Sequence, residues 1–256
     1  MTTASLRVIQ NTPTLREMTA DRLREAIFTM HFKPNDRLVE RDLCDQTGVS
    51  RTCVREALRH LESEGLVERR SNKGLYVTAV TSAEAKQIYE VRGALEPVVA
   101  RLFVERASDA DVKALRQAIS HIGSAISGKP VRAYVQALDE FYDALLRGSG
   151  NEVARRILQT LHARITYLRT ITAAKAQPAR KRETLALMRG IADAAAGRDA
   201  KEVVRRCATF VERSGAYALQ VLNAEPASTL PQGNCPSFLA KAACGARPRL
   251  YNKQSA

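Results

Sequence analysis

Apolar residues recur at helical spacing through the first part of the chain and are followed by two short β-prone runs. Three helices are predicted there, over about 14–32, 40–47 and 50–64. Pro34 and Gly48 separate them, because proline and glycine end helices. The runs 66–70 and 75–80 flank an Asn/Gly turn, which predicts a hairpin. The order helix, helix, turn, helix, hairpin is that of a winged helix-turn-helix, which we assign to residues 14–80.

The remainder of the chain contains almost no strand signal. Six further helices are predicted, over about 82–106, 109–126, 130–147, 151–174, 179–196 and 199–223. Short polar loops separate them, as in an α-helical bundle. The sequence thus predicts a mainly α protein, in which a winged helix-turn-helix with a small β-hairpin wing precedes an all-α helical bundle over residues 81–224. Residues 1–13 are expected to form a flexible arm, and residues 225–256, rich in Pro, Gly, Ala and Ser, a disordered tail.

The net charge of +13 permits binding to a polyanion but does not prove it. Residues 1–80 carry 13 basic and 11 acidic side chains, a net charge of +2, whereas residues 81–224 carry 23 and 15, a net charge of +8. The excess therefore lies outside the predicted winged helix. An argument for DNA binding has to depend on motif and geometry rather than on total charge.

No apolar run approaches the roughly 20 residues that a membrane helix needs, and the first residues do not resemble an export signal. We therefore expect no membrane partner and a cytoplasmic location.

The five cysteines are an odd number without zinc-finger spacing, so free thiols are expected. A metal-dependent enzyme in the bundle is a disfavoured alternative, because the sequence contains no ligand cluster and no acid–base pair that would serve one.

Three arginines of the third predicted helix, Arg51, Arg55 and Arg59, are spaced i, i+4 and i+8 and share one face. Apolar residues occupy the opposite face. Such a helix fits the major groove, where a guanidinium donates two hydrogen bonds to a guanine or binds phosphates. The N-terminal residues of a recognition helix lie deepest in the groove, which favours Ser50, Arg51, Thr52 and Arg55. Arg59 lies farther along and could equally be a solvated surface charge.

The run from Leu38 to Val67, LVERDLCDQTGVSRTCVREALRHLESEGLV, resembles the signature of the GntR family of transcription regulators. The resemblance implies that arginines of the second and third helices contact operator bases and phosphates. It also implies that small polar neighbours contact the DNA backbone and that the wing tip reaches the minor groove. Cys53 departs from the family pattern, in which Pro or Thr is usual. The predicted DNA-binding residues are Arg41, Ser50, Arg51, Thr52, Cys53, Arg55, Arg59, Lys73 and Gly74.

The second half resembles the all-helical FCD domain of the FadR/VanR branch of that family. The matching stretches are Ile88–Glu96, Phe141 with Ser149–Asn151, and Gly197–Asp199. Many members of that branch bind a divalent metal through an Asp, a His four residues later and two further His residues. The resemblance places Leu138, Tyr142, Met188 and Phe210 at these four positions. None of them suits a hard or borderline divalent ion, so we predict that the domain holds no metal and no other cofactor.

A pocket at these positions would be apolar with one hydroxyl, and nearby arginines would supply charge for a carboxylate. The predicted effector-binding residues are Arg92, Tyr142, Arg164, Met188 and Phe210. The expected effector is a small organic acid, either an aromatic or an aliphatic carboxylate. The alternative is that these side chains only fill the core, in which case the bundle is a packing and dimerisation module.

The resemblance implies a homodimer that binds a near-palindromic double-stranded DNA operator, with one recognition helix in each half-site. We expect a repressor and no enzymatic activity, and an effector that changes operator affinity by shifting populations. The alternative from another class is a nucleic-acid-binding protein without sequence preference that uses the +8 charge of the bundle.

Overall fold

The computed structural model describes residues 13–71 and 73–224. The predicted arm, apart from Pro13, and the predicted tail lie outside the described residues, as does Asn72. Within the described ranges, no helix is long and apolar enough to cross a membrane.

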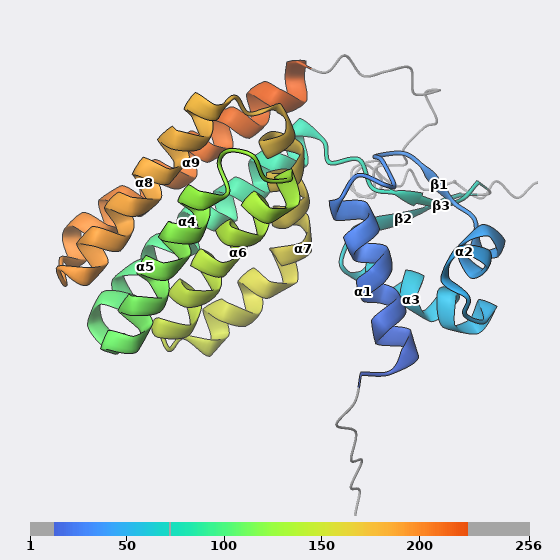
Figure 1. Ribbon diagram of the computed structural model, residues 1–256, viewed down its shortest axis with the longest axis horizontal. Coiled ribbons are helices and arrows are strands. Elements are labelled where there is room, and N and C mark those ends of the chain that lie inside the picture. Colours follow the sequence, from blue (N-terminus) through green and yellow to red (C-terminus); the bar gives the residue numbers. More distant parts are fainter. Residues whose placement is uncertain (1–12, 72, 225–256) are drawn as a thin grey trace, which may run out of the picture. The chain divides into compact units, whose positions relative to one another are not determined.

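The first part of the chain forms three helices and a small antiparallel sheet (Figure 1). Its elements are α1 (Leu15–Phe28), β1 (Arg37–Leu38), α2 (Glu40–Thr47), α3 (Arg51–Ser63), β2 (Val67–Arg70) and β3 (Gly74–Val77). Strand β3 lies between β1 and β2, so that Tyr76 is opposite Arg37 on one side and Glu68 on the other. The predicted winged helix-turn-helix fold is confirmed, and β1 is an addition that the sequence did not predict.

Local chemistry explains where these helices begin and end. Helix α1 starts at a capping box, in which the Thr14 side chain accepts a hydrogen bond from the backbone of Glu17 and the Glu17 carboxylate accepts one from the backbone of Thr14. The helix ends at Phe28 rather than near residue 32 as predicted. The reason is that Met30 adopts a left-handed conformation, with φ at 60°, and turns the chain away. Helix α2 ends at Gly48, whose φ of 70° suits glycine.

The winged helix has its own apolar core. Its buried side chains come from all three helices and from the sheet, and include Leu23, Ile27, Leu43, Val54, Leu58, Leu61, Leu66 and Val77. Burial of each such side chain contributes about 1.5–3 kcal/mol to stability. The core therefore holds α3 by one face and leaves its other face on the surface.

The second part of the chain is an all-α bundle (Figure 1). Its helices are α4 (Ser82–Arg106), α5 (Asp109–Ser124), α6 (Val131–Gly148), α7 (Glu152–Lys175), α8 (Pro178–Ala196) and α9 (Ala200–Ala224). Every one of these boundaries lies within two residues of its predicted position. Helix α4 packs along α9, α5 packs against α6 and α8, and α8 packs against α9.

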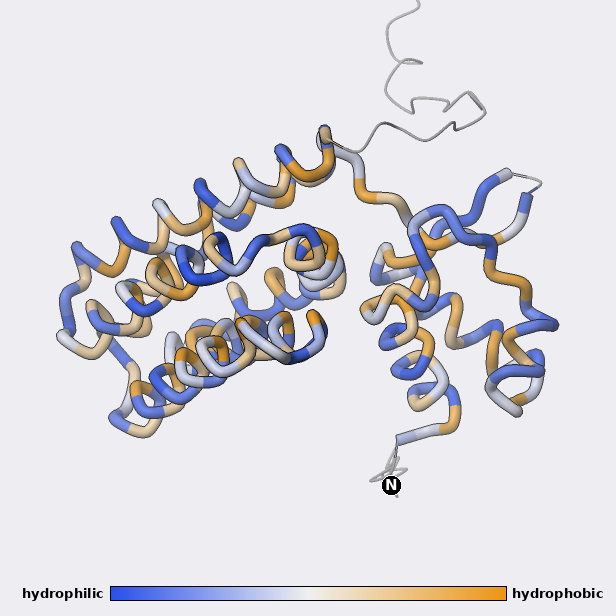
Figure 2. The backbone as a smooth tube through the Cα atoms, turned by 45° about the horizontal axis from the view of Figure 1, so that its top comes forward, coloured by the Kyte–Doolittle hydropathy of each residue, from blue (hydrophilic) through white to orange (hydrophobic). Residues whose placement is uncertain are grey.

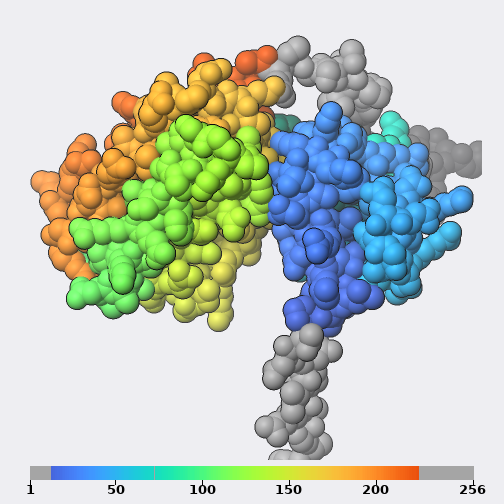
Figure 3. All heavy atoms as spheres, in the orientation of Figure 1, coloured from blue at the N-terminus to red at the C-terminus, as the bar shows by residue number. Residues whose placement is uncertain are grey.

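The bundle helices alternate hydrophobic and hydrophilic stretches along their length, as amphipathic helices do (Figure 2). Their apolar faces form one cluster that includes Phe103, Leu115, Ile122, Phe141, Leu145, Met188, Cys207 and Val211. Side chains close the spaces between the ribbons of α5, α6 and α8 on the face shown in Figure 3. This packing fixes the positions of α4, α6, α7, α8 and α9, which together surround the cavity described below.

Candidate DNA-binding surface and effector pocket

The turn between α2 and α3 presents the N-terminus of α3 at the surface. The Ser50 hydroxyl accepts a hydrogen bond of 3.3 Å from the backbone N–H of Cys53 and caps the helix. Val54, Ala57, Leu58 and Leu61 bury one face of α3. Arg51, Thr52, Arg55 and Arg59 are exposed on the other, and Arg41 is exposed on α2. The structure thus brings together five of the predicted DNA-binding side chains, with Ser50 beside them.

The arginines of this surface differ in their partners. Arg55 donates from Nε and Nη2 to the two carboxylate oxygens of Glu40, at 3.2 and 2.9 Å. Arg59 donates to Glu56 at 2.6 Å. Within residues 13–71 and 73–224, neither Arg41 nor Arg51 has an ion-pair partner, so their N–H groups remain available to a phosphate or a base edge.

Cys53 is the predicted residue that the structure places differently from its neighbours. Its Sγ lies 3.4 Å from the hydroxyl of Thr19 on α1, and the side chain is half-buried. The thiol is therefore turned toward α1, whereas Ser50 and Thr52, at the start of the same helix, are exposed.

The wing presents a second basic surface. Gly74 has a φ of 100°, which side-chain-bearing residues rarely adopt, and Lys73 beside it is exposed. A groove of about 170 Å³ between the wing and the start of α2 is lined in part by Arg37, Arg69 and Gly74. The exposed Arg37 and Arg69 were not predicted as site residues. The sequence did not indicate a role for Arg37, because its strand has only two residues and gives no alternating pattern.

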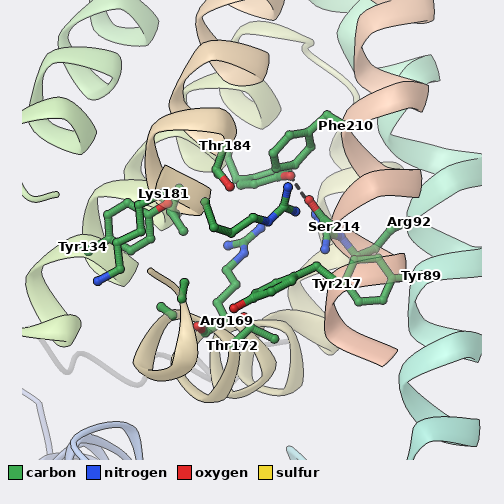
Figure 4. Close-up of a pocket in the computed structure, with 15 residues that line it drawn as sticks. Tyr89, Arg92, Tyr134, Arg169, Thr172, Lys181, Thr184, Phe210, Ser214 and Tyr217 are labelled. Atoms are coloured by element: carbon green, nitrogen blue, oxygen red, sulfur yellow. Dashed lines mark hydrogen bonds between the residues drawn. The ribbon is translucent and has the colours of Figure 1, made fainter. Parts of the chain in front are cut away.

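A cavity of about 60 Å³ lies inside the bundle, and Figure 4 shows its lining side chains. Four cations from α4, α7 and α8 surround it: Arg92, Arg169, Arg180 and Lys181. Aromatic side chains fill the spaces between them: Tyr89, Tyr134, Tyr142, Phe210 and Tyr217. The hydroxyls of Thr172, Thr184 and Ser214 complete the polar part of the lining. A cavity with this lining is suited to an anion.

Arg92 is the most deeply buried of the four cations, with 1% of its surface exposed. It donates to the Glu96 carboxylate at 2.5 Å and to the Tyr142 hydroxyl at 2.7 Å. Burial lowers the pKa of Arg92, but the charge of Glu96 and the nearby tyrosines outweigh burial and raise it well above its usual value. Burial also raises the pKa of Tyr142, so its phenol stays neutral. Arg92 is thus permanently charged and is already neutralised by Glu96.

The other three cations lie against tyrosine rings. The Arg169 guanidinium is 4.1 Å from the centroid of Tyr142, and the same side chain is paired with Asp139 at 2.5 Å. Arg180 lies 4.7 Å from the ring of Tyr217 and is paired with Glu183 at 2.8 Å.

Lys181 lies 5.2 Å from the ring of Tyr134 and has no ion-pair partner in the part of the chain that the structure describes. Burial raises the pKa of Tyr134 to about 12, so this phenol is also neutral. Among the four cations of the lining, Lys181 is therefore the one whose positive charge is not paired with a carboxylate of the described residues.

The predicted effector residues are only partly brought together. Arg92, Tyr142 and Phe210 line the cavity. Met188 is fully buried and does not line it, since it fills the core beside the cavity. Arg164 lies elsewhere on α7, is 37% exposed and pairs with Glu84 at 3.2 Å. The cation that α7 supplies to the cavity is Arg169 instead.

The four residues that stand at the metal-ligand positions implied by the resemblance do not fit a divalent ion. Leu138, Tyr142 and Phe210 line the cavity, and Met188 is packed in the core. They offer no carboxylate and no imidazole, which are the donors such ions require. Across residues 13–71 and 73–224, no group of three or more His, Cys, Asp or Glu side chains is placed to hold a metal. His121 is engaged with Glu140 at 2.7 Å, on the surface.

Two family models match the chain. Residues 15–77 match the model described as bacterial regulatory proteins, gntR family, and residues 87–213 match the model described as FCD domain. The Nta operon transcriptional regulator of Aminobacter aminovorans is 33% identical over 142 residues, which are 55% of this chain and 67% of that protein. The HTH-type transcriptional regulator BphR of Paraburkholderia xenovorans strain LB400 is 30% identical over 215 residues, which are 80% of this chain and 86% of that protein.

Solved structures share the fold. Escherichia coli McbR/YncC superposes with a TM-score of 0.72 at 21% sequence identity, and the match covers 82% of this chain and 99% of that one. At this identity the similarity concerns the arrangement of helices and strands. It agrees with a winged helix followed by an all-α domain.

Proposed function

This chain is a GntR-family transcription regulator with an FCD domain, and on that premise we propose that it acts in the cytoplasm as a homodimeric repressor of a near-palindromic DNA operator. The observation that carries the proposal is the exposed face of α3, on which Arg51 and Arg55 stand beside the Ser50 cap. A two-fold dimer presents two such helices to successive half-sites. The wing, with Lys73 at its tip, then reaches the adjacent groove.

Selection of binding sites from a random double-stranded DNA library tests this proposal. We expect an inverted repeat to emerge, bound as a dimer. Affinity for it should fall steeply with salt, because each neutralised phosphate releases counterions. Competition with unrelated DNA is the control. Equal binding to selected and unrelated DNA would contradict the proposal and favour a nucleic-acid-binding protein without sequence preference.

We further propose that the cavity in the bundle binds a small organic carboxylate, which changes operator affinity. Three of the four lining cations have carboxylate partners of their own, namely Glu96, Asp139 and Glu183. Lys181 has none in the described chain, so the ligand carboxylate is assigned to it, with the neutral phenols as further hydrogen-bond groups. Helix α8 adds to this preference, since it starts next to the cavity without a side-chain cap or an acidic residue in its first turn.

The size of the cavity bears on the choice of ligand. Its volume of about 60 Å³ is small, which favours a short aliphatic carboxylate over an aromatic one.

Replacement of Lys181 by Gln tests the carboxylate assignment. Acetate, propanoate, benzoate and inorganic phosphate are titrated into the full chain by calorimetry, and at least one carboxylate is expected to bind. The Lys181→Gln variant should bind it about tenfold or more weakly, because a hydrogen bond between charged groups is lost. Arg182→Gln removes the same charge from the next residue of α8, which is exposed and outside the lining, and should leave binding unchanged.

Two outcomes would contradict this assignment. Equal weakening in both variants would mean that the general positive charge of α8, not Lys181, attracts the anion. Failure of every carboxylate to bind would favour a bundle that serves only packing and dimerisation.

Metal content gives a separate test. The purified protein is expected to hold no stoichiometric zinc, nickel or manganese, and a chelator should change neither its melting temperature nor its DNA affinity. The reason is that an isobutyl group, a phenol, a thioether and a phenyl ring stand where ligands would be needed, so an ion would lose hydration without replacement. Elemental analysis that finds about one tightly held metal per chain would overturn this expectation.

A further inference from the structure

The pair between Arg55 and Glu40 joins the two helices of the helix-turn-helix. Glu40 is the first residue of α2, and Arg55 lies in the second turn of α3. Both carboxylate oxygens are used, at 3.2 Å from Nε and 2.9 Å from Nη2. The contact is two-pronged, which fixes the plane of the guanidinium as well as its position.

This geometry leaves a defined part of Arg55 free. A guanidinium carries five N–H donors, and Glu40 occupies one on Nε and one on Nη2. The edge formed by Nη1 and the second hydrogen of Nη2 is not used by Glu40. Two parallel donors of this kind match the O6 and N7 acceptors of guanine in the major groove.

We propose that Glu40 is a positioning residue that holds the Arg55 guanidinium with its free edge toward the DNA, and thereby sets a guanine preference at one base pair of each half-site. The inference rests on the proposed operator binding. Glu40 itself touches no base. Its carboxylate is repelled by DNA phosphates, so it lowers affinity for DNA of any sequence. Its contribution is to sequence discrimination, because it orients Arg55.

The other arginines of this surface are held differently. Arg59 binds Glu56 of its own helix, three residues away, through a contact that reaches only one of the carboxylate oxygens. Arg51 and Arg41 have no ion-pair partner in the described residues and are free to follow phosphates. The hydrogen bond from Arg55 lowers the pKa of Glu40 and outweighs burial, which raises it, so the carboxylate is ionised at neutral pH. Among these four arginines, Arg55 alone pairs with a carboxylate of another helix within residues 13–71 and 73–224.

The experiment compares Glu40→Gln, Arg55→Ala and the double variant with the full wild-type chain, on the site selected by the wild type. Arg55→Ala identifies the base pair that Arg55 reads, because preference is lost there. Glu40→Gln should lose about fivefold or more of the discrimination at that same base pair. It should keep discrimination elsewhere and bind unrelated DNA at least as well as the wild type. In the Arg55→Ala background, Glu40→Gln should have no further effect on discrimination.

Glu56→Gln is the matched control, because it removes a carboxylate that is half-buried like that of Glu40 but pairs with an arginine of its own helix, and it should not change base preference. Glu40→Asp, which keeps the charge and shortens the reach, should give an intermediate loss if Glu40→Gln melts early. Unchanged preference in Glu40→Gln, or an even loss at all positions, would overturn the proposal. If the wild type selects no site, the proposed function fails instead, and the two failures are thereby distinguished.

Discussion

Arg51→Ala and Arg55→Ala are each expected to weaken binding to the selected operator by between about fivefold and about 150-fold. Both side chains are exposed on the face of α3 opposite its buried residues, near the N-terminus that enters a major groove most deeply. Loss of two N–H donors to a base edge leaves the acceptors of that base without partners. Equilibrium titration with labelled operator at a fixed salt concentration measures the effect.

Arg59→Ala serves as the comparison on the same helix. It should cost less, because Arg59 lies farther from the N-terminus and is engaged with Glu56. Since all three side chains are exposed, melting temperature and dimer formation should not change. Wild-type affinity in both Arg51→Ala and Arg55→Ala would show that the motif has been assigned to the wrong face or the wrong helix.

The helices were predictable because their apolar spacing and their stop signals agree. Gly48 ends α2 with a positive φ, and Ser50 caps α3, as the sequence indicates. The two errors in the winged helix have local causes. Strand β1 is too short to show a pattern and forms only because β3 offers a free edge. The end of α1 depends on the left-handed conformation of Met30, which no residue preference reveals.

The cavity was less predictable, because its character depends on which turn of a helix faces inward. Arg164 and Arg169 lie five residues apart on α7, so they point in different directions around it. Arg169 faces the cavity, whereas Arg164 pairs with Glu84 outside the cavity lining. Arg180 and Lys181 lie in the first turn of α8, where the sequence shows only a basic run. Their contacts with Tyr217 and Tyr134 come from tertiary packing.

The charges around the cavity serve two different purposes. Lys181 lacks a carboxylate partner within the described residues and is assigned to the ligand. Arg92 and Glu96 form a pair within α4 that is almost completely buried. Such a pair is costly to desolvate and adds little net stability, but each member needs the other. Stability and ligand binding should therefore respond to different substitutions.

Arg92→Met is accordingly expected to lower the free energy of unfolding by about 3–5 kcal/mol, because it leaves the Glu96 carboxylate buried without a partner. Denaturant unfolding followed by circular dichroism measures this. Arg101→Met is the matched control, since Arg101 pairs with Glu105 at the same i, i+4 spacing on the same helix but is exposed. That substitution should cost about 0.5 kcal/mol or less.

The double variant Arg92→Met with Glu96→Leu separates the charge effect from packing. It should recover most of the lost stability, because apolar side chains of similar volume often replace a buried ion pair without loss. Recovery should be incomplete, since the Tyr142 hydroxyl loses the N–H that it accepts. If the folded double variant binds the carboxylate as tightly as the wild type does, while Lys181→Gln binds it more weakly, Arg92 is a structural cation and Lys181 binds the ligand. If Arg92→Met unfolded at the same midpoint denaturant concentration as the wild type, the claim that an unpaired, buried Glu96 destabilises the fold would be contradicted.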